Sequence, residues 1–118
     1  MVFRAGVKLV PTSMFIRDHL SKVGEDYPWN MWTQLKEQRA LVGQKCGGIL
    51  NFLVYIWWLK QLGLIELSGR TEPSMYPGRD RNYYRLVARN VNKIKEWTNP
   101  RAALYPDSYR AYHSGSRY

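Results

Sequence analysis

Arginine is concentrated in one stretch of this 118-residue chain, between Ser68 and Arg89. The stretch holds five arginines and two carboxylates, a local net charge of +3; the arginines are Arg70, Arg79, Arg81, Arg85 and Arg89. A guanidinium group suits phosphate because it donates two parallel, charge-assisted hydrogen bonds. Three tyrosines, Tyr76, Tyr83 and Tyr84, lie between the arginines and could bind phosphate or pack on a sugar. We therefore predict that this stretch contacts a nucleic-acid backbone.

The same stretch also fits an ordinary solvent-exposed hairpin whose tyrosines pack within a sheet. Successive side chains of a strand point to opposite faces. If "RNYYRLVA" is a strand, at least one of Tyr83 and Tyr84 therefore turns inward. The loop arginines stay exposed in either case and keep their capacity to bind phosphate.

The charge of the whole chain also favours contact with nucleic acid. It has 18 Lys and Arg against 9 Asp and Glu, a net charge of +9, and 14% of its residues are aromatic. This combination favours a polyanionic partner, although a basic balance can also serve solubility alone.

Residues suited to catalysis or metal binding are sparse. Cys46 is the only cysteine, which excludes an internal disulfide and a cysteine-rich zinc site. His19 and His113 lie far apart and belong to no Ser/His/Asp or His/Glu motif, and no glycine-rich phosphate loop is present. The sequence therefore predicts no enzyme, no cofactor and no metal. Surface or helix-end positions are expected for His19, Asp18, Glu25 and Asp26.

Three helices are predicted to position these residues. Apolar residues at helical spacing predict a first helix over about Ser13 to Val23 and a second from about Met31 to Val42. A third runs over about Gly48 to Leu62. The segment "EDYPWN", between the first two, contains Pro28 and is predicted as a turn.

The second half of the chain is predicted to begin with a β-hairpin. Two strand-prone segments, "LIELSG" and "RNYYRLVA", are joined by a loop rich in turn residues, and one or two helical turns follow Asn90. The fold class is thus α+β, mostly α with a small β hairpin. We divide the chain into a domain over residues 1–97 and a basic, Tyr-rich C-terminal tail over residues 98–118.

The segment "YIWWLKQLGLIEL" resembles the link between third helix and hairpin in small archaeal and bacterial winged-helix proteins. In these proteins a leucine, a glycine and two apolar residues are common; the residues in those places here are Leu62, Gly63, Leu64 and Ile65. Gly63 suits the left-handed conformation that often follows a helix. The resemblance covers about Ser13 to Ala88 and implies a winged helix-turn-helix, three helices plus a two- or three-stranded wing.

In that family the third helix commonly enters the major groove and the wing, here about Ser68 to Arg81, touches the nucleic-acid backbone. This third helix contains no arginine and one lysine, Lys60, although contact of arginine with guanine is the commonest specific one. On a helical wheel, the expected core side consists of Ile49, Phe52, Leu53, Ile56 and Leu59. The opposite side consists of Asn51, Val54, Trp58 and Gln61, flanked by Leu50 and Tyr55.

The predicted nucleic-acid interface therefore joins helix residues to the wing. Gln44 and Lys45 lie at the N-terminus of the third helix, where free N–H groups and the helix dipole favour phosphate. Asn51, Trp58 and Gln61 face outward from the helix. The wing contributes Arg70, Tyr76, Arg79, Arg81 and Arg85.

Leu50, Val54 and Trp58 are expected to form an exposed apolar patch, a feature that usually marks an interface. In order of preference, the patch is a dimer seam, a surface covered by the C-terminal tail, or a contact with thymine methyl groups. The tail tyrosines Tyr105, Tyr109 and Tyr112 follow an i, i+4, i+7 spacing, so a helical tail could cover the patch. An unstructured Tyr-rich end fits the same residues.

Together these features predict a winged-helix protein that binds double-stranded DNA largely through phosphate contacts, as a homodimeric transcriptional regulator or chromosome-associated factor. A ribosome-associated or other RNA-binding winged helix is one alternative, and a protein-interaction adaptor that uses the apolar third helix is another.

Membrane insertion is not expected. The longest apolar run, Ile49 to Leu59, is shorter than the about 18 to 20 residues that span a bilayer. The start of the chain lacks the long apolar segment of a signal peptide. We therefore expect a cytoplasmic protein, associated with the nucleoid or with ribosomes, and no membrane partner.

Overall fold

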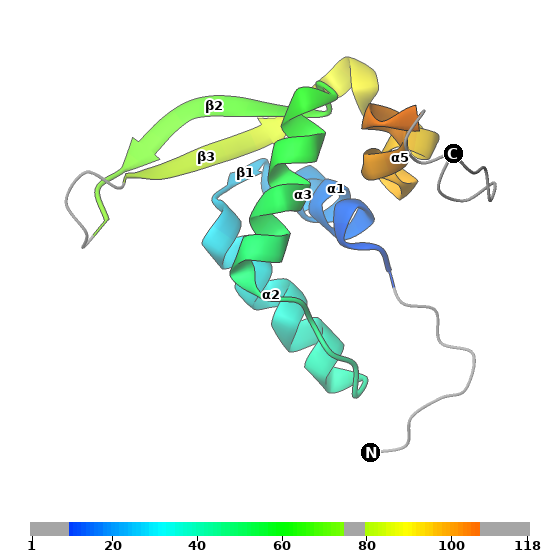
Figure 1. Ribbon diagram of the computed structural model, residues 1–118. Coiled ribbons are helices and arrows are strands. Elements are labelled where there is room, and N and C mark those ends of the chain that lie inside the picture. Colours follow the sequence, from blue (N-terminus) through cyan, green and yellow to red (C-terminus); the bar gives the residue numbers. More distant parts are fainter. Residues whose placement is uncertain (1–9, 75–79, 107–118) are drawn as a thin grey trace.

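A computed structural model describes residues 10–74 and 80–106 of the chain, in which the helices pack together and a narrow hairpin projects from them (Figure 1). The elements in order are α1 (Thr12–Val23), β1 (Glu25–Asp26), α2 (Pro28–Leu41), α3 (Ile49–Gln61), β2 (Ile65–Glu72), β3 (Arg81–Leu86), the 3-10 helix η1 (Ala88–Asn90), α4 (Ile94–Thr98) and α5 (Pro100–Leu104). The predicted α+β class is confirmed, and so are the three predicted helices and the hairpin.

The sheet has three antiparallel strands in the order β1-β3-β2. Strand β1 was predicted as part of a turn, which is wrong, because Glu25 pairs with Arg85 and Asp26 with Tyr84 of β3. Two residues are too few to show a strand pattern, so only the partner strand reveals this one. The register between β2 and β3 shifts after Leu67, where Gly69 has a φ of +94° and allows the extra residues of a β-bulge.

The core lies where α1, α2, α3, the start of β2 and α4 meet. Trp97 of α4 is completely buried in it. The indole Nε1 of Trp97 donates to the backbone oxygen of Asn90 over 3.0 Å, and its backbone oxygen accepts from the Ser13 hydroxyl. The segment after the hairpin therefore completes the core.

Helix α5 continues the packed structure into the segment that the sequence assigns to a tail. Pro100 is buried, and α5 contacts both α3 and α4. Asn99 caps α5, since its Oδ1 accepts from the N–H of Ala102 over 3.2 Å. The packed part of the chain thus extends to at least Leu104.

The turn after α3 is a Schellman motif, which closes the helix and starts β2. The N–H of Gly63 donates to the oxygen of Lys60, and the N–H of Leu64 donates to the oxygen of Leu59. Gly63 has a φ of +74°, as the left-handed position after a helix requires, and Leu59 and Leu64 are both fully buried. The role predicted for Gly63 is confirmed.

A buried polar cluster joins α1, β1 and α2. Asp26 accepts from Asn30 Nδ2 over 2.7 Å and from the N–H of Tyr27 over 2.8 Å, and it contacts His19 Nε2 at 2.6 Å. The expectation that His19 and Asp26 lie at the surface is wrong, because both are buried. Pro28 begins α2 instead of a turn, since the first helical position needs no N–H donor.

Trp97 should carry a large part of the stability. We expect Trp97→Ala to lower the free energy of unfolding by about 3–5 kcal/mol, because a fully buried indole leaves a large cavity. Urea denaturation followed by circular dichroism measures the change. The matched control is Trp29→Ala, at a side chain 57% exposed, which should cost about 1 kcal/mol or less. Equal costs for the two variants would contradict this placement of Trp97.

Candidate nucleic-acid interface

The hairpin arginines differ in how they are engaged. Arg70 donates to Glu25 over 3.1 Å and to Glu72 over 3.0 Å. Arg85 donates to Glu66 over 2.8 Å. Arg81 is exposed, and its guanidinium lies 4.9 Å from the centre of the Tyr27 ring. Tyr76 and Arg79 lie outside the described residues. Of the predicted wing arginines that are described, only Arg81 forms no ion pair with a described carboxylate, although its charge helps to lower the pKa of Glu72.

Arg70 holds the sheet together from edge to edge. From β2 it crosses the central strand, where its guanidinium lies 4.1 Å from the centre of the Tyr83 ring, and reaches Glu25 on β1. The Tyr83 hydroxyl donates to Glu72, and its ring meets Tyr27 edge-on at 5.3 Å. Tyr83 is buried, which confirms that at least one of the two neighbouring tyrosines turns inward. Tyr84 points to the opposite face of the sheet and packs against the core.

These contacts shift the pKa values of the carboxyl and phenol groups around Arg70. Hydrogen bonds from Ser68 and Arg70 lower the pKa of Glu25 below its ordinary 4.5. Hydrogen bonds from Tyr83 and Arg70 lower the pKa of Glu72 in the same direction. The pKa of Tyr83 is raised, chiefly by its hydrogen bond to Glu72, and burial raises the pKa of Tyr84. Both carboxylates are therefore ionised at neutral pH and hold Arg70 in place.

The N-terminus of α3 is open to solvent. Lys45, Gly47 and Gly48 are exposed and Gln44 is half-buried. Trp32 Nε1 donates to the oxygen of Gly47 over 2.8 Å and fixes the chain just before the helix. Lys45 forms no ion pair with any described residue. Lys45 is thus an exposed cation in the loop that leads into this helix, and its contact with phosphate stays a prediction.

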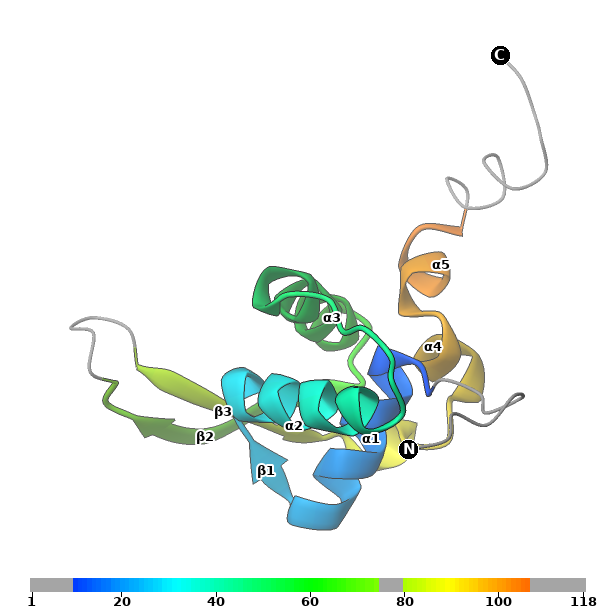
Figure 2. The same cartoon turned by 90° about the horizontal axis from the view of Figure 1, so that it is seen from below.

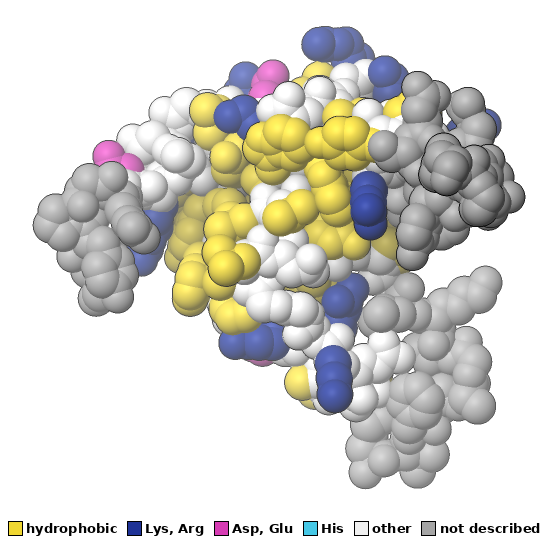
Figure 3. All heavy atoms as spheres, viewed as in Figure 1, with side chains coloured by type: hydrophobic (Ala, Val, Ile, Leu, Met, Phe, Trp, Pro, Cys, Tyr) yellow, Lys and Arg dark blue, Asp and Glu magenta, His cyan; other side chains and the backbone are white. Residues whose placement is uncertain are grey.

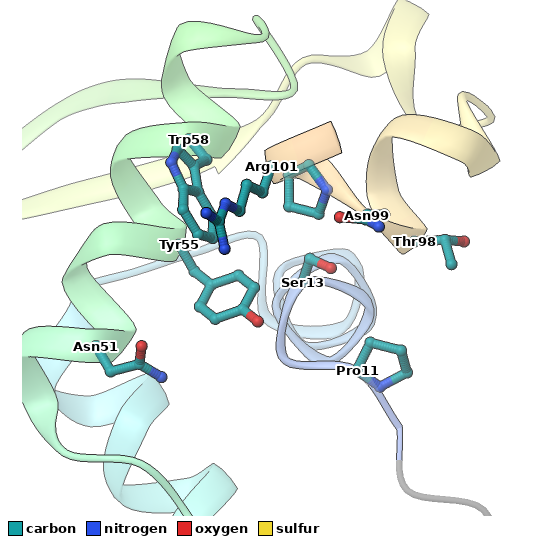
Figure 4. A pocket seen from close by; sticks show the side chains of 9 residues that line it. Pro11, Ser13, Asn51, Tyr55, Trp58, Thr98, Asn99 and Arg101 are labelled. Carbon is teal, nitrogen blue, oxygen red and sulfur yellow. The ribbon is translucent and has the colours of Figure 1, made fainter. Parts of the chain in front are cut away.

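Asn51 and Trp58, predicted to face nucleic acid, line a groove between α3, the start of α1 and the C-terminal helices (Figure 4); Asn51 is exposed and Trp58 is half-buried. The groove encloses about 270 Å³, and its lining includes Tyr55, Asn99 and Arg101. Arg101 extends from α5 toward Trp58 across the opening (Figure 4). Trp58 is partly covered on this side, so the sequence was wrong to group it with Leu50 and Val54 on one exposed patch. Gln61 is exposed at the end of α3.

The outer side of α3 is apolar. Leu50 is 76% exposed, Leu53 40%, Val54 43% and Trp57 48%. The prediction that Leu53 faces the core is wrong, and Trp57 was missed, because the core side is narrower than the wheel of apolar residues suggests. Figure 3 shows hydrophobic side chains gathered over α3, with Lys and Arg side chains around them.

Further basic side chains lie outside the hairpin, and three of them, Lys93, Lys95 and Arg101, were missed by reasoning that concentrated on the wing and the third helix. Lys60 ends α3, Arg89 lies on η1, and Arg101 on α5. Lys93 and Lys95 flank the start of α4. All five are exposed, and none forms an ion pair with a described residue. The only available signal was their excess over nearby acidic residues in the sequence.

The chain matches no protein-family model, no curated protein and no solved structure. Within the described residues, no group of three or more His, Cys, Asp or Glu side chains could hold a metal ion. None of the described helices is long and apolar enough to cross a membrane.

The tail tyrosines Tyr109 and Tyr112 lie outside the described residues, and Tyr105 is exposed just after α5.

The pKa values of Glu25 and Glu72 should change when Arg70 is removed. A lowered pKa in the folded state gives stability that is present above the unfolded pKa, near 4.5, and is lost as the pH falls through the folded pKa. We expect Arg70→Gln to raise the pKa values of Glu25 and Glu72 toward 4.5. The variant should therefore lose less folding stability than the wild type when the pH falls. NMR titration of the side-chain carboxyl carbons measures both values. Arg89→Gln, which removes an exposed arginine elsewhere, should leave them unchanged; unchanged values in Arg70→Gln would refute the assignment.

Proposed function

We propose that this protein is a winged-helix protein that binds double-stranded DNA, mainly through phosphate contacts. The observation that carries the proposal is the arrangement of α2, α3 and the hairpin. Two helices joined by a short turn precede a hairpin that projects past the helices (Figure 1). The order α1-β1-α2-α3-β2-β3 and the sheet order β1-β3-β2 are those expected of a winged helix-turn-helix, which is a fold-level analogy.

The distribution of unpaired charge supports phosphate contact more than base reading. Lys45, in the loop just before α3, and Arg81, at the start of β3 in the hairpin, are both exposed; helix and hairpin are the two elements that meet DNA in this class of protein. The outer side of α3 offers no cation to a base, since the only charged residue in Ile49–Gln61 is Lys60. Binding of this kind depends on charge and varies little with sequence.

Salt dependence tests the proposal. We expect binding to random-sequence duplex DNA to weaken steeply with salt, with a log–log slope of about −0.9 for each phosphate neutralised. Fluorescence anisotropy at several salt concentrations measures the slope, and single strands and structured RNA serve as competitors. A flat salt dependence, or tighter binding to RNA than to duplex DNA, would contradict the proposal.

Single substitutions test which cations make the contacts. Lys45→Ala and Arg81→Ala should each reduce the magnitude of the slope by about 1 and weaken binding to every duplex alike. The matched control is Arg85→Ala, which changes the charge equally but removes an arginine engaged by Glu66. The control should change the slope by less than either test variant. The same change in all three variants would argue for general charge and against specific contacts.

A further inference from the structure

Helix α3 has three apolar sides, and only two of them have partners among the described residues. The first holds Phe52, Ile56 and Leu59, which are buried in the core. The second holds Tyr55 and Trp58, which face α5 across the groove. At 100° per residue, the third side lies about a third of a turn from each of the others. It consists of Leu50, Leu53, Val54 and Trp57, here called the outer stripe, all at least 40% exposed.

We propose that the outer stripe is the seam of a homodimer in which α3 packs antiparallel against α3 of a second copy. Figure 2 shows α3 with α2 on one side and α5 on another, while its remaining side is open among the described elements. The chain's own C-terminal helix already covers the neighbouring side of α3. This proposal goes beyond DNA binding, since a dimer forms with or without nucleic acid.

The spacing of the outer stripe fits a second copy of the same helix. Its residues follow the i, i+3, i+4, i+7 pattern, which forms a continuous apolar ridge along one side of a helix. Two identical ridges related by a two-fold axis can form an isologous interface. In such an interface, any contact between two positions occurs twice, once in each direction. In the antiparallel arrangement, Leu50 meets the partner's Trp57 at both ends, so that a large side chain always packs against a smaller one.

The lack of charge on the outer stripe favours an uncharged partner on that side of α3, while the proposed phosphate contacts lie before the helix and on the hairpin. The outer stripe carries no charge, whereas the chain as a whole has a net charge of +9. Two copies repel least where they expose no cations. Antiparallel pairing places the two Lys60 side chains at opposite ends, about 20 Å apart along the seam at 1.5 Å per residue, which exceeds the screening length of about 8–10 Å.

The area of the stripe suits a reversible dimer. The exposed fractions of the four residues amount to roughly 400 Å² of surface, the size of the largest apolar patch on a typical monomer, which is often functional. This is about half of the ~800 Å² that one partner buries in a standard interface. The polar residues beside the stripe would supply the remainder as a hydrated rim.

Sedimentation velocity of the full chain over a range of micromolar concentrations, without nucleic acid, tests the dimer. We expect Val54→Glu, near the two-fold axis, to raise the dissociation constant at least about tenfold, because it places two like charges side by side in an apolar seam. The matched control is Leu41→Glu, which makes the same kind of change at a 73% exposed position of α2 and should leave the constant unchanged. Circular dichroism of both variants verifies that each is folded.

Disulfide trapping tests the antiparallel direction. In a Cys46→Ser background, a cysteine at Val54 should cross-link to itself, because the two copies of this position lie within the about 4.4–6.8 Å between Cα atoms that a disulfide spans. A cysteine at Leu50 should cross-link poorly to itself but readily to a chain with cysteine at Trp57. A parallel seam would instead give equal self-cross-linking at both positions and would overturn the antiparallel arrangement.

A wild-type chain that stays monomeric at all concentrations would overturn the dimer. If the cysteine at Val54 then reacted slowly with a thiol reagent, a segment of the same chain would be covering the stripe. A dimer that Val54→Glu leaves intact would place the seam elsewhere. None of these results decides whether the chain binds DNA, since the salt dependence is measured separately.

Discussion

The constraint on which the structure depends is the apolar character of α3. A helix that is apolar around almost all of its circumference favours a cover on each apolar side, because contact of water with an uncovered apolar side is unfavourable. Helices α1 and α2 provide the first cover, through a core that contains Phe52 and Ile56. The C-terminal helix α5 provides the second. The segment after the hairpin is therefore part of the folded unit, and Trp97 anchors it.

The hairpin illustrates how structure and ligand compete for the same charges. Arg70 joins β2 to β1 across Tyr83, so two carboxylates already neutralise its charge and compete with phosphate for its guanidinium. Arg85 is engaged in the same way by Glu66. Counting arginines thus overstates the charge available to a polyanion. Exposed cations that form no ion pair with a described residue, such as Lys45 and Arg81, are the better candidates for contact.

The sequence predicts the local features of this fold well and the long-range ones poorly. The three helices, the hairpin and the position of Gly63 follow from spacing, propensity and turn chemistry within a few residues. The short strand β1 escapes prediction, because its existence depends on β3, about 60 residues later. The cluster of His19 and Asp26 is likewise invisible, since seven residues of sequence give no sign that the two side chains meet in a buried site.

For the candidate interface, too, the sequence predicts the local features and the structure adds the contacts between distant residues. The sequence by itself determined that the chain is basic, that its third helix lacks arginine, and that its arginines gather in the hairpin, since these are properties of composition and order. Only the tertiary structure decided how wide the core side of α3 is, which leaves Leu53 and Trp57 exposed. It also decided which arginines are neutralised. Ion pairing and burial depend on distances in space, and Arg70 and Glu25, 45 residues apart in the chain, become neighbours only when the sheet forms.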